Sequence, residues 1–91
     1  MYLRVTRGRF DPAAADQVTA LVGDVAAAVE RLPGFQQLYQ ARDLSGGTTV
    51  TISLWDTEAH ARFSRDQMGD VIARIADAGV RLEPPEILEI V

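Results

Sequence analysis

The sequence is set apart first by the residue types that it lacks. Its 91 residues include no cysteine, no lysine and no asparagine, and a single histidine, His60. Without cysteine the chain can form no disulfide, no thiolate nucleophile and no sulfur-ligated metal centre. Without lysine it has no amine for Schiff-base chemistry. A metal site would have to consist mostly of carboxylates, and the acidic residues show no ligand-like spacing. We therefore expect neither a metal nor another cofactor.

Positive charge is also sparse. All nine basic residues are arginines scattered along the chain, and 13 acidic residues bring the net charge to −4. A nucleic-acid-binding surface would need a basic stripe, and the apolar runs are too short to span a membrane. Residues 1–10 carry arginines and lack the apolar segment of a signal peptide. We therefore expect a cytoplasmic protein with no nucleic-acid or membrane partner.

The residues that are present predict one globular domain over 1–91, since 47% are hydrophobic and 24% are charged. Asp11-Pro12 is typical of a helix start, and Pro33-Gly34 ends the apolar helical pattern that follows. Ser45-Gly46-Gly47 is typical of a hairpin turn between antiparallel strands. Alternating patterns predict four strands, over residues 2–10, 35–43, 48–55 and 86–91.

The second helical region, which begins after Asp56 or Thr57, does not keep its phase. Ala59 and Phe63 share one face, but the later apolar residues lie on nearly the opposite one. We therefore expect a break or kink between Ser64 and Gly69 that separates two helical pieces.

The order β-α-β-β-α-β predicts an α+β, ferredoxin-like fold, with both helices on one face of a four-stranded antiparallel sheet. Strand parity predicts that the other face carries a mixed polar and aromatic row. Its members are Arg4, Thr6, Gln37, Tyr39, Thr51, Ser53 and Trp55. A monomer would leave this row in water, so we expect a homodimer that closes sheet on sheet around a lined pocket.

Two short motifs carry a family resemblance. The turn Leu32-Pro33-Gly34-Phe35, and the strand end that runs from Leu54 through Trp55 to Ala59, resemble the antibiotic biosynthesis monooxygenase family. The resemblance covers nearly the whole chain and implies a dimeric α/β-barrel. It also implies a ligand site lined by the tryptophan. Known members include cofactor-free oxygenases of polycyclic aromatic compounds and haem-degrading enzymes.

The resemblance also argues against haem degradation. Haem-degrading members carry an asparagine on the first strand and a histidine along the second helix. In this sequence Thr6 stands at the asparagine position, and Arg65, near the expected break, stands close to the histidine position. His60 comes more than one helical turn before that position. The polyketide oxygenases also use an asparagine, which this chain cannot supply.

Two residues are candidates for proton transfer. His60 has the only side chain whose ordinary pKa lies near neutrality, although a helix-start histidine between Glu58 and Arg62 also suits open solvent. Tyr39 suits the transfer of a proton in a dry cavity, or a hydrogen bond across a dimer interface.

The remaining candidates would bind substrate. Trp55 suits stacking on a flat ligand or packing at the interface. Arg4 needs a carboxylate or an anionic ligand, and a glutamate is the more common partner. The substrate-binding candidates are Trp55, Arg4, Thr6, Thr51, Ser53 and Phe63.

Two functions follow as hypotheses. The first is a cofactor-independent monooxygenase that acts on a flat phenolic or polycyclic aromatic compound, because such substrates react with oxygen once they are deprotonated. The second is a dimer on the same fold that binds a small molecule, or serves in a stress response, without catalysis.

Overall fold

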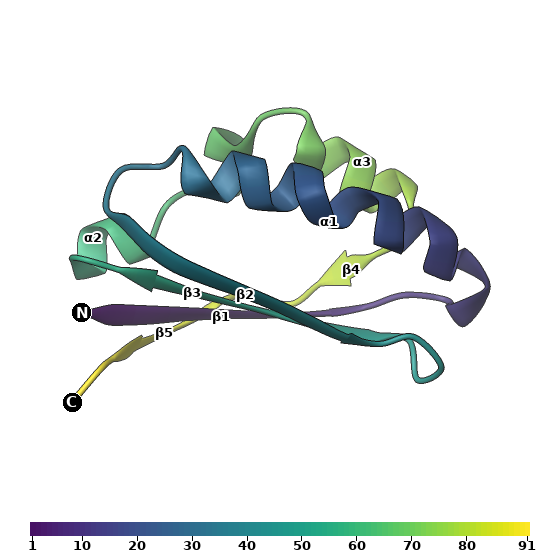
Figure 1. Cartoon of the computed structure of the whole chain (residues 1–91), viewed down its shortest axis with the longest axis horizontal. Helices are drawn as coiled ribbons and strands as arrows, with labels where there is room; N and C mark the ends of the chain where they lie inside the picture. Colours follow the sequence, from purple (N-terminus) through teal and green to yellow (C-terminus); the bar gives the residue numbers. More distant parts are fainter.

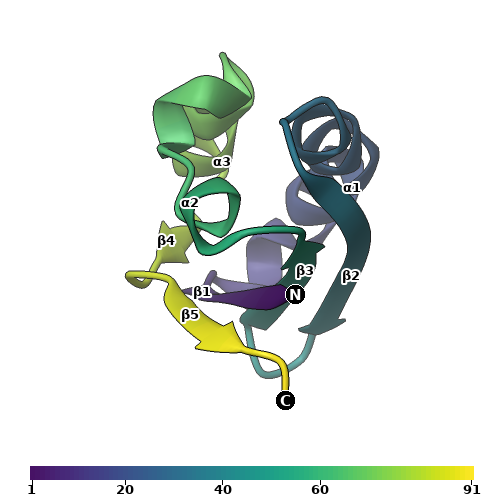
Figure 2. The same ribbon diagram turned by 90° about the vertical axis from the view of Figure 1, so that its left-hand side faces the viewer.

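The computed structural model describes all residues, 1–91, and confirms the α+β, ferredoxin-like architecture. An antiparallel sheet lies on one side and the helices cover one of its faces (Figures 1 and 2). The elements in chain order are β1 (Tyr2–Arg9), the 3-10 turn η1 (Pro12–Ala14), α1 (Ala15–Glu30), β2 (Phe35–Asp43), β3 (Thr48–Trp55), α2 (Glu58–Ala61), the 3-10 turn η2 (Arg65–Met68), α3 (Val71–Asp77), β4 (Arg81–Leu82) and β5 (Glu86–Glu89). The sheet order is β2-β3-β1-β4, and β5 also pairs with β1.

The first helical segment begins where the sequence predicts. The Asp11 carboxylate accepts a hydrogen bond of 2.9 Å from the Ala13 amide, and Pro12 follows at the first helical position. The chain makes one 3-10 turn before α1 starts at Ala15. A capping carboxylate and a proline thus fix where the chain leaves β1 and turns over the sheet.

The expected break in the second helical region is confirmed. α2 is a short helix of four residues, and α3 resumes only at Val71. Between them Ser64 and Gln67 form a capping box around η2, and Gly69 ends that turn with a positive φ of 74°. Each piece therefore turns its own apolar side inward, which a continuous helix could not do.

The last strand is divided in two, whereas the sequence pattern predicts one. β4 pairs with Gly8 and Arg9, β5 pairs with residues 2–5 of the same strand, and Pro84-Pro85 lies between them. Proline has no amide hydrogen to donate to the ladder, so the two prolines interrupt the pairing.

The prediction of which sheet face the helices cover is wrong. The pairs Arg4–Ser53 and Thr6–Thr51 of β1 and β3 lie on the helix-covered face. Leu3, Val5, Ile52 and Leu54 occupy the opposite face, which is the more apolar of the two on these strands. The polar row thus lies between sheet and helices and not on the sheet's open side.

A β-bulge in β2 moves Tyr39 away from this row. Phe35 is paired with Trp55, but Gln37 is paired with Leu54, so Gln36 is an extra residue on its strand. Side-chain parity reverses at that point. Tyr39 therefore lies beside Ile52 on the open face with 56% of its surface exposed, contrary to the prediction that it shares a face with Trp55.

Trp55 lies at the centre of the hydrophobic core. It is 0% exposed, and its ring contacts Phe35 and Phe63 at centroid distances of 5.8 and 5.1 Å. Burying a tryptophan side chain stabilises a fold by roughly 4–6 kcal/mol on area grounds. The buried cluster around it contains Leu21, Ala28, Val29, Leu32, Ala61, Met68, Val71 and Ile75. No helix has the length and apolar character needed to cross a bilayer.

Candidate ligand cavity

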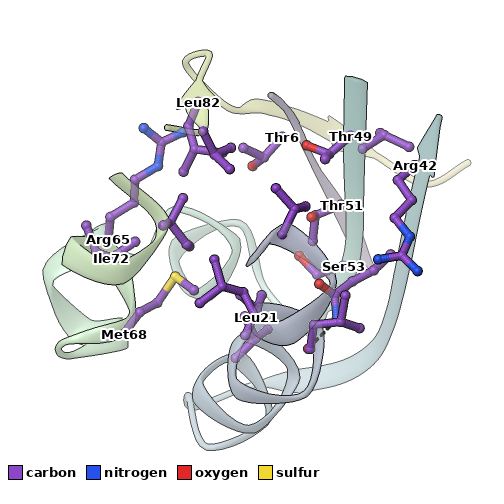
Figure 3. Close-up of a pocket in the computed structure, with 18 of the residues that line it drawn as sticks. Thr6, Leu21, Arg42, Thr49, Thr51, Ser53, Arg65, Met68, Ile72 and Leu82 are labelled. Atoms are coloured by element: carbon purple, nitrogen blue, oxygen red, sulfur yellow. Dashed lines mark hydrogen bonds between the residues drawn. The ribbon is translucent and has the colours of Figure 1, made fainter. Parts of the chain in front are cut away.

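A cavity of about 240 Å³ lies between the sheet and the helices. Thirteen of its 21 lining residues are hydrophobic, and the apolar ones come mainly from α1, η2 and α3. In Figure 3, Leu21, Met68 and Ile72 face the strands that carry Thr6, Thr51 and Ser53 across the open space. A concave, largely apolar space with a few polar groups on one wall is the usual form of a small-molecule site.

The polar wall follows from the pairing of β1 with β3. Arg4 lies opposite Ser53, Thr6 opposite Thr51, and Gly8 opposite Thr49, all on the cavity side. At Gly8 a side chain would meet the Thr49 hydroxyl at 2.8 Å and press on Val80 and Leu82. The absence of a side chain there lets these residues close one end of the cavity.

Arg4 is a buried cation with no carboxylate partner. It is 5% exposed, and its Nη1 donates hydrogen bonds of 2.9 Å to the carbonyls of Ala61 and Phe63. Its guanidinium carbon lies 3.7 Å from the centre of the Phe63 ring, a cation–π contact. None of the five ion pairs within the chain involves it, so the expected glutamate partner is not found in the same chain.

Burial makes the Arg4 guanidinium more acidic than an exposed one. Loss of water lowers the pKa of its guanidinium to about 10, and the nearby positive charge of Arg65 lowers it further in the same direction. A cation that is desolvated beside another cation is electrostatically unfavourable until an anion joins it.

Part of the Arg4 guanidinium remains available. Both hydrogen bonds use Nη1, which leaves the N–H groups of Nε and Nη2 without a protein acceptor. No fully buried side-chain nitrogen or oxygen in the protein lacks a partner, so these two nitrogens keep accessible surface. Arg4 is also one of the residues that line the cavity.

Ser53 supplies a second oriented donor. Its hydroxyl accepts a hydrogen bond of 2.8 Å from Nε1 of Trp55, and the residue is only 3% exposed. An oxygen that accepts from the indole keeps its own hydrogen free for another acceptor. Ser53 lines the cavity, whereas Trp55 does not. Trp55 is thus buried behind the cavity wall, where it holds the serine that faces the ligand space.

The charged residues around the cavity are all positive. Arg4, Arg42 and Arg65 line it, and no aspartate or glutamate does. Arg65 donates to the Glu83 carbonyl at 2.6 Å, and Arg42 donates to the Thr19 hydroxyl of α1 at 2.7 Å. In a chain with a net charge of −4, this local excess of positive charge distinguishes the cavity from the rest of the molecule.

The two candidates for proton transfer lie outside the cavity. Tyr39 is on the open face of the sheet, and His60 is on α2, where its Nδ1 lies 2.6 Å from Oδ1 of Asp56. This contact lowers the pKa of the Asp56 carboxyl. Neither residue lines the cavity, and the structure does not bring them together. No cluster of residues that could hold a metal ion is present either.

Of the substrate-binding candidates, Arg4, Thr6, Thr51, Ser53 and Phe63 line the cavity, and Trp55 lies behind it. Sequence analysis missed Gln40 and Arg42, which the bulge turns inward. Gln40 donates to the Val22 carbonyl of α1 at 3.0 Å. It also missed the apolar wall that α1 contributes. In the sequence this stripe looks like the core-facing side of any amphipathic helix, and only the cavity in the structure identifies it as ligand-facing.

The fold is similar to that of several solved structures, two of which are oxygenases. HapK from Hahella chejuensis matches with a TM-score of 0.79 at 18% identity, over 100% of this chain and 93% of that one. SnoaB, a cofactor-independent oxygenase from Streptomyces nogalater, matches with a TM-score of 0.66 at 17% identity, over 98% and 91%. The ActVA-Orf6 monooxygenase of Streptomyces coelicolor, solved with nanaomycin D, matches with a TM-score of 0.67 at 18% identity, over 96% and 82%.

Sequence comparison gives the family directly. No curated protein sequence matches the chain. The family profile described as antibiotic biosynthesis monooxygenase matches residues 1–74, which include the β1–β3 wall, α1 and the helical break. The chain therefore belongs to the antibiotic biosynthesis monooxygenase family.

Proposed function

We propose that the protein is a cofactor-independent monooxygenase that oxidises a phenolic aromatic compound in the cavity between the sheet and the helices. The observation that carries the proposal is the unpaired, buried Arg4 guanidinium at the polar wall of an otherwise apolar cavity. Family membership and the fold it shares with SnoaB and ActVA-Orf6 support the reaction class.

The proposed reaction needs binding, orientation and charge stabilisation. A phenol loses its proton, and the electron pair of the phenolate forms a carbon–oxygen bond to O₂ at the ring carbon opposite the oxygen. The resulting hydroperoxide eliminates water and leaves a second carbonyl, so one phenol and one O₂ give one quinone and one water. Arg4 and Ser53 would stabilise the phenolate oxygen, which lowers the barrier to ionisation.

The proton acceptor is the part of this mechanism that differs from expectation. Tyr39 and His60 were the candidates, and neither lines the cavity. The lining residues hold no carboxylate and no imidazole, so we assign the proton to water at the cavity mouth. Stabilisation of the anion by Arg4 then takes the place of a positioned base.

The volume of the cavity narrows the substrate class. About 240 Å³ lies just below the ~300–1,000 Å³ typical of sites for drug-sized ligands. A phenol of one or two fused rings suits this space better than a larger polycyclic compound.

Oxygen uptake tests the proposal directly. Purified protein is mixed with naphthol in an oxygen electrode, with protein-free buffer as the background, and the product is analysed after reaction in isotopically labelled O₂. We expect protein-dependent uptake and a naphthoquinone that carries one labelled oxygen. Uptake that yields hydrogen peroxide and no label in the quinone would contradict a monooxygenase, as would the absence of uptake with all one- and two-ring phenols.

We also propose that residues 1–91 form one domain that acts in the cytoplasm as a homodimer, closed across the open face of the sheet. Tyr39 and Leu88 are 56% and 49% exposed there, next to the partly exposed Leu3, Ile52 and Leu54. A twofold interface would bury this apolar surface. Light scattering should give twice the chain mass for the native protein and one chain mass for Ile52→Arg. A monomeric native protein would exclude the dimer.

A second function is favoured by the absence of a base among the lining residues. The same cavity could bind a small molecule without turnover, as in the non-catalytic or stress-response dimer considered above. Saturable binding of phenols with no protein-dependent oxygen uptake would support this function and exclude the first.

A further inference from the structure

We propose that the ligand enters the cavity as an organic anion, a compact aromatic acid whose carboxylate is bound by Arg4 and Ser53 beneath the Phe63 ring. This inference rests on the proposed function for the location of the ligand site, and it assigns to a carboxylate the two donors that would otherwise hold the phenolate oxygen. It concerns what the site recognises and not the oxidation itself.

The first argument is the state of Arg4. Its guanidinium is 5% exposed and has no carboxylate within the protein. A buried cation without a counter-ion is costly, and an arriving anion offsets that cost. A neutral phenol would have to ionise after entry to do the same, whereas a carboxylate is already charged at neutral pH.

The second argument is geometric. A structural role for Arg4, which is to tie the end of α2 to the sheet, uses only Nη1 and its bonds to Ala61 and Phe63. The Nε and Nη2 groups remain without a protein acceptor, and Arg4 is one of the residues that line the cavity. This side of a guanidinium is a planar fork that matches the two oxygens of a carboxylate.

Groups next to Arg4 also favour the binding of an anion. Ser53 is the cross-strand partner of Arg4, and its hydroxyl hydrogen is free because its oxygen accepts from Trp55. Arg65 lines the same cavity and is close enough for its charge to act on Arg4. No acidic side chain lines the cavity to repel an anion.

The rest of the cavity fits the ring of such an acid. Phe63 covers the guanidinium, and Val25, Met68 and Ile72 are among the apolar lining residues. The described site thus has one charged end and apolar walls, which suits a molecule with one carboxylate on one or two rings.

Binding of matched ligands tests the inference on the native protein. Naphthoate and naphthamide have the same shape, but only the first is charged. Binding is measured by calorimetry and by the fluorescence of Trp55, the single tryptophan, whose serine partner lines the cavity. We expect naphthoate to bind once per chain and naphthamide to bind roughly ten- to a hundred-fold more weakly, the range of one charge-assisted hydrogen-bonded contact.

Variants assign the preference to its residues. Arg4→Met should remove the preference for the acid, and Ser53→Ala should reduce it several-fold. Arg74→Met is the matched control, because Arg74 lies outside the cavity and pairs with Asp24 at 2.6 Å. It should keep the preference for the acid. Circular dichroism establishes that each variant is folded.

Several results would overturn the inference. These are equal affinity for naphthoate and naphthamide, a preference that survives Arg4→Met, or no binding of either naphthoate or benzoate at millimolar concentration. None of these measurements uses oxygen. If phenols are oxidised but acids are not preferred, the inference fails and the proposed monooxygenase stands. If acids are preferred but no phenol is oxidised, the inference stands and the proposed monooxygenase fails.

Discussion

The indole Nε1 of Trp55 donates a hydrogen bond of 2.8 Å to the hydroxyl of Ser53, two residues earlier on the same face of β3. Trp55 is 0% exposed, and Ser53 lines the ligand cavity. The bond thus links the hydrophobic core to the polar wall of the site. The core residue acts on the ligand only through the serine that it orients.

This pair should be coupled energetically. Ser53→Ala leaves a buried indole N–H without an acceptor, so we expect a loss of about 1–3 kcal/mol in the free energy of unfolding. Trp55→Phe removes the donor as well as part of the ring. In the double variant the serine change should therefore cost clearly less than it does alone, as urea denaturation of all four proteins would show. Strict additivity would contradict the coupling.

Arg4 allows a prediction in which the conservative substitution is the worse one. Arg4→Met loses two hydrogen bonds to carbonyls but no longer buries a charge, so we expect a net loss of no more than about 2 kcal/mol. Arg4→Lys keeps the charge as a strongly hydrated ammonium that cannot form the fork or stack on Phe63. Thermal unfolding should therefore rank Arg4→Lys below Arg4→Met. The opposite order would show that charge alone matters at this position.

Gly34 is required by the contact between the turn and α2. Its φ is +81°, and a Cβ atom there would overlap the side chains of Asp56 and His60. We expect Gly34→Ala to destabilise the protein by about 2–4 kcal/mol, the range for backbone strain combined with steric overlap.

Gly69 is the matched control for Gly34. It also has a positive φ, of 74°, but open space surrounds the position of a Cβ atom. Gly69→Ala should therefore cost only the backbone strain, about 1–3 kcal/mol, and less than Gly34→Ala. Equal losses in chemical denaturation for the two variants would mean that contact with Asp56 and His60 adds nothing.

The Asp56–His60 pair predicts a pH dependence in the acid range. The hydrogen bond from His60 is the largest cause of the lowered Asp56 pKa, against an ordinary value of 3.8. A carboxyl group whose pKa is lowered in the folded state contributes its full stabilisation above pH 3.8. It loses this stabilisation as the pH falls through the lowered pKa. Urea midpoints measured below pH 3.8 should therefore fall less steeply for His60→Ala than for the native protein. Arg62→Ala, which removes an exposed pair with Glu58 on the same helix, should keep the native slope.

The sequence predicts the elements well because their signals are local. The Asp11-Pro12 cap, the hairpin glycines and the loss of helical phase after Phe63 each involve a few neighbouring residues. The structure confirms all three, and the turn η2 occupies the expected break in the second helical region. Five of the six substrate-binding candidates also line the cavity: uninterrupted strand parity on β1 and β3 places four of them there, and Phe63 follows α2.

Sequence reasoning failed where a residue's position depends on contacts between elements. It placed the polar row on the open side of the sheet, since the apolar face of a strand is normally the one packed against helices. Here Leu3, Val5, Ile52 and Leu54 lie on the open side. Trp55 was expected to line a ligand pocket or a dimer interface because it shares parity with the hydroxyls, but its ring packs in the core against Phe35 and Phe63.

The extra residue at Gln36 has a consequence for how length changes in this chain would act. Before it, odd-numbered side chains of β2 point to the cavity side, and after it even-numbered ones do, as Phe35 and Gln40 show. Deleting Gln36 would remove the bulge and leave every other pair of β2 with β3 in place, so Gln40 and Arg42 would still face the cavity. The loss of one residue from β1 or β3, which have no such extra residue, would instead shift the register and exchange part of the cavity wall with the outer surface of the sheet.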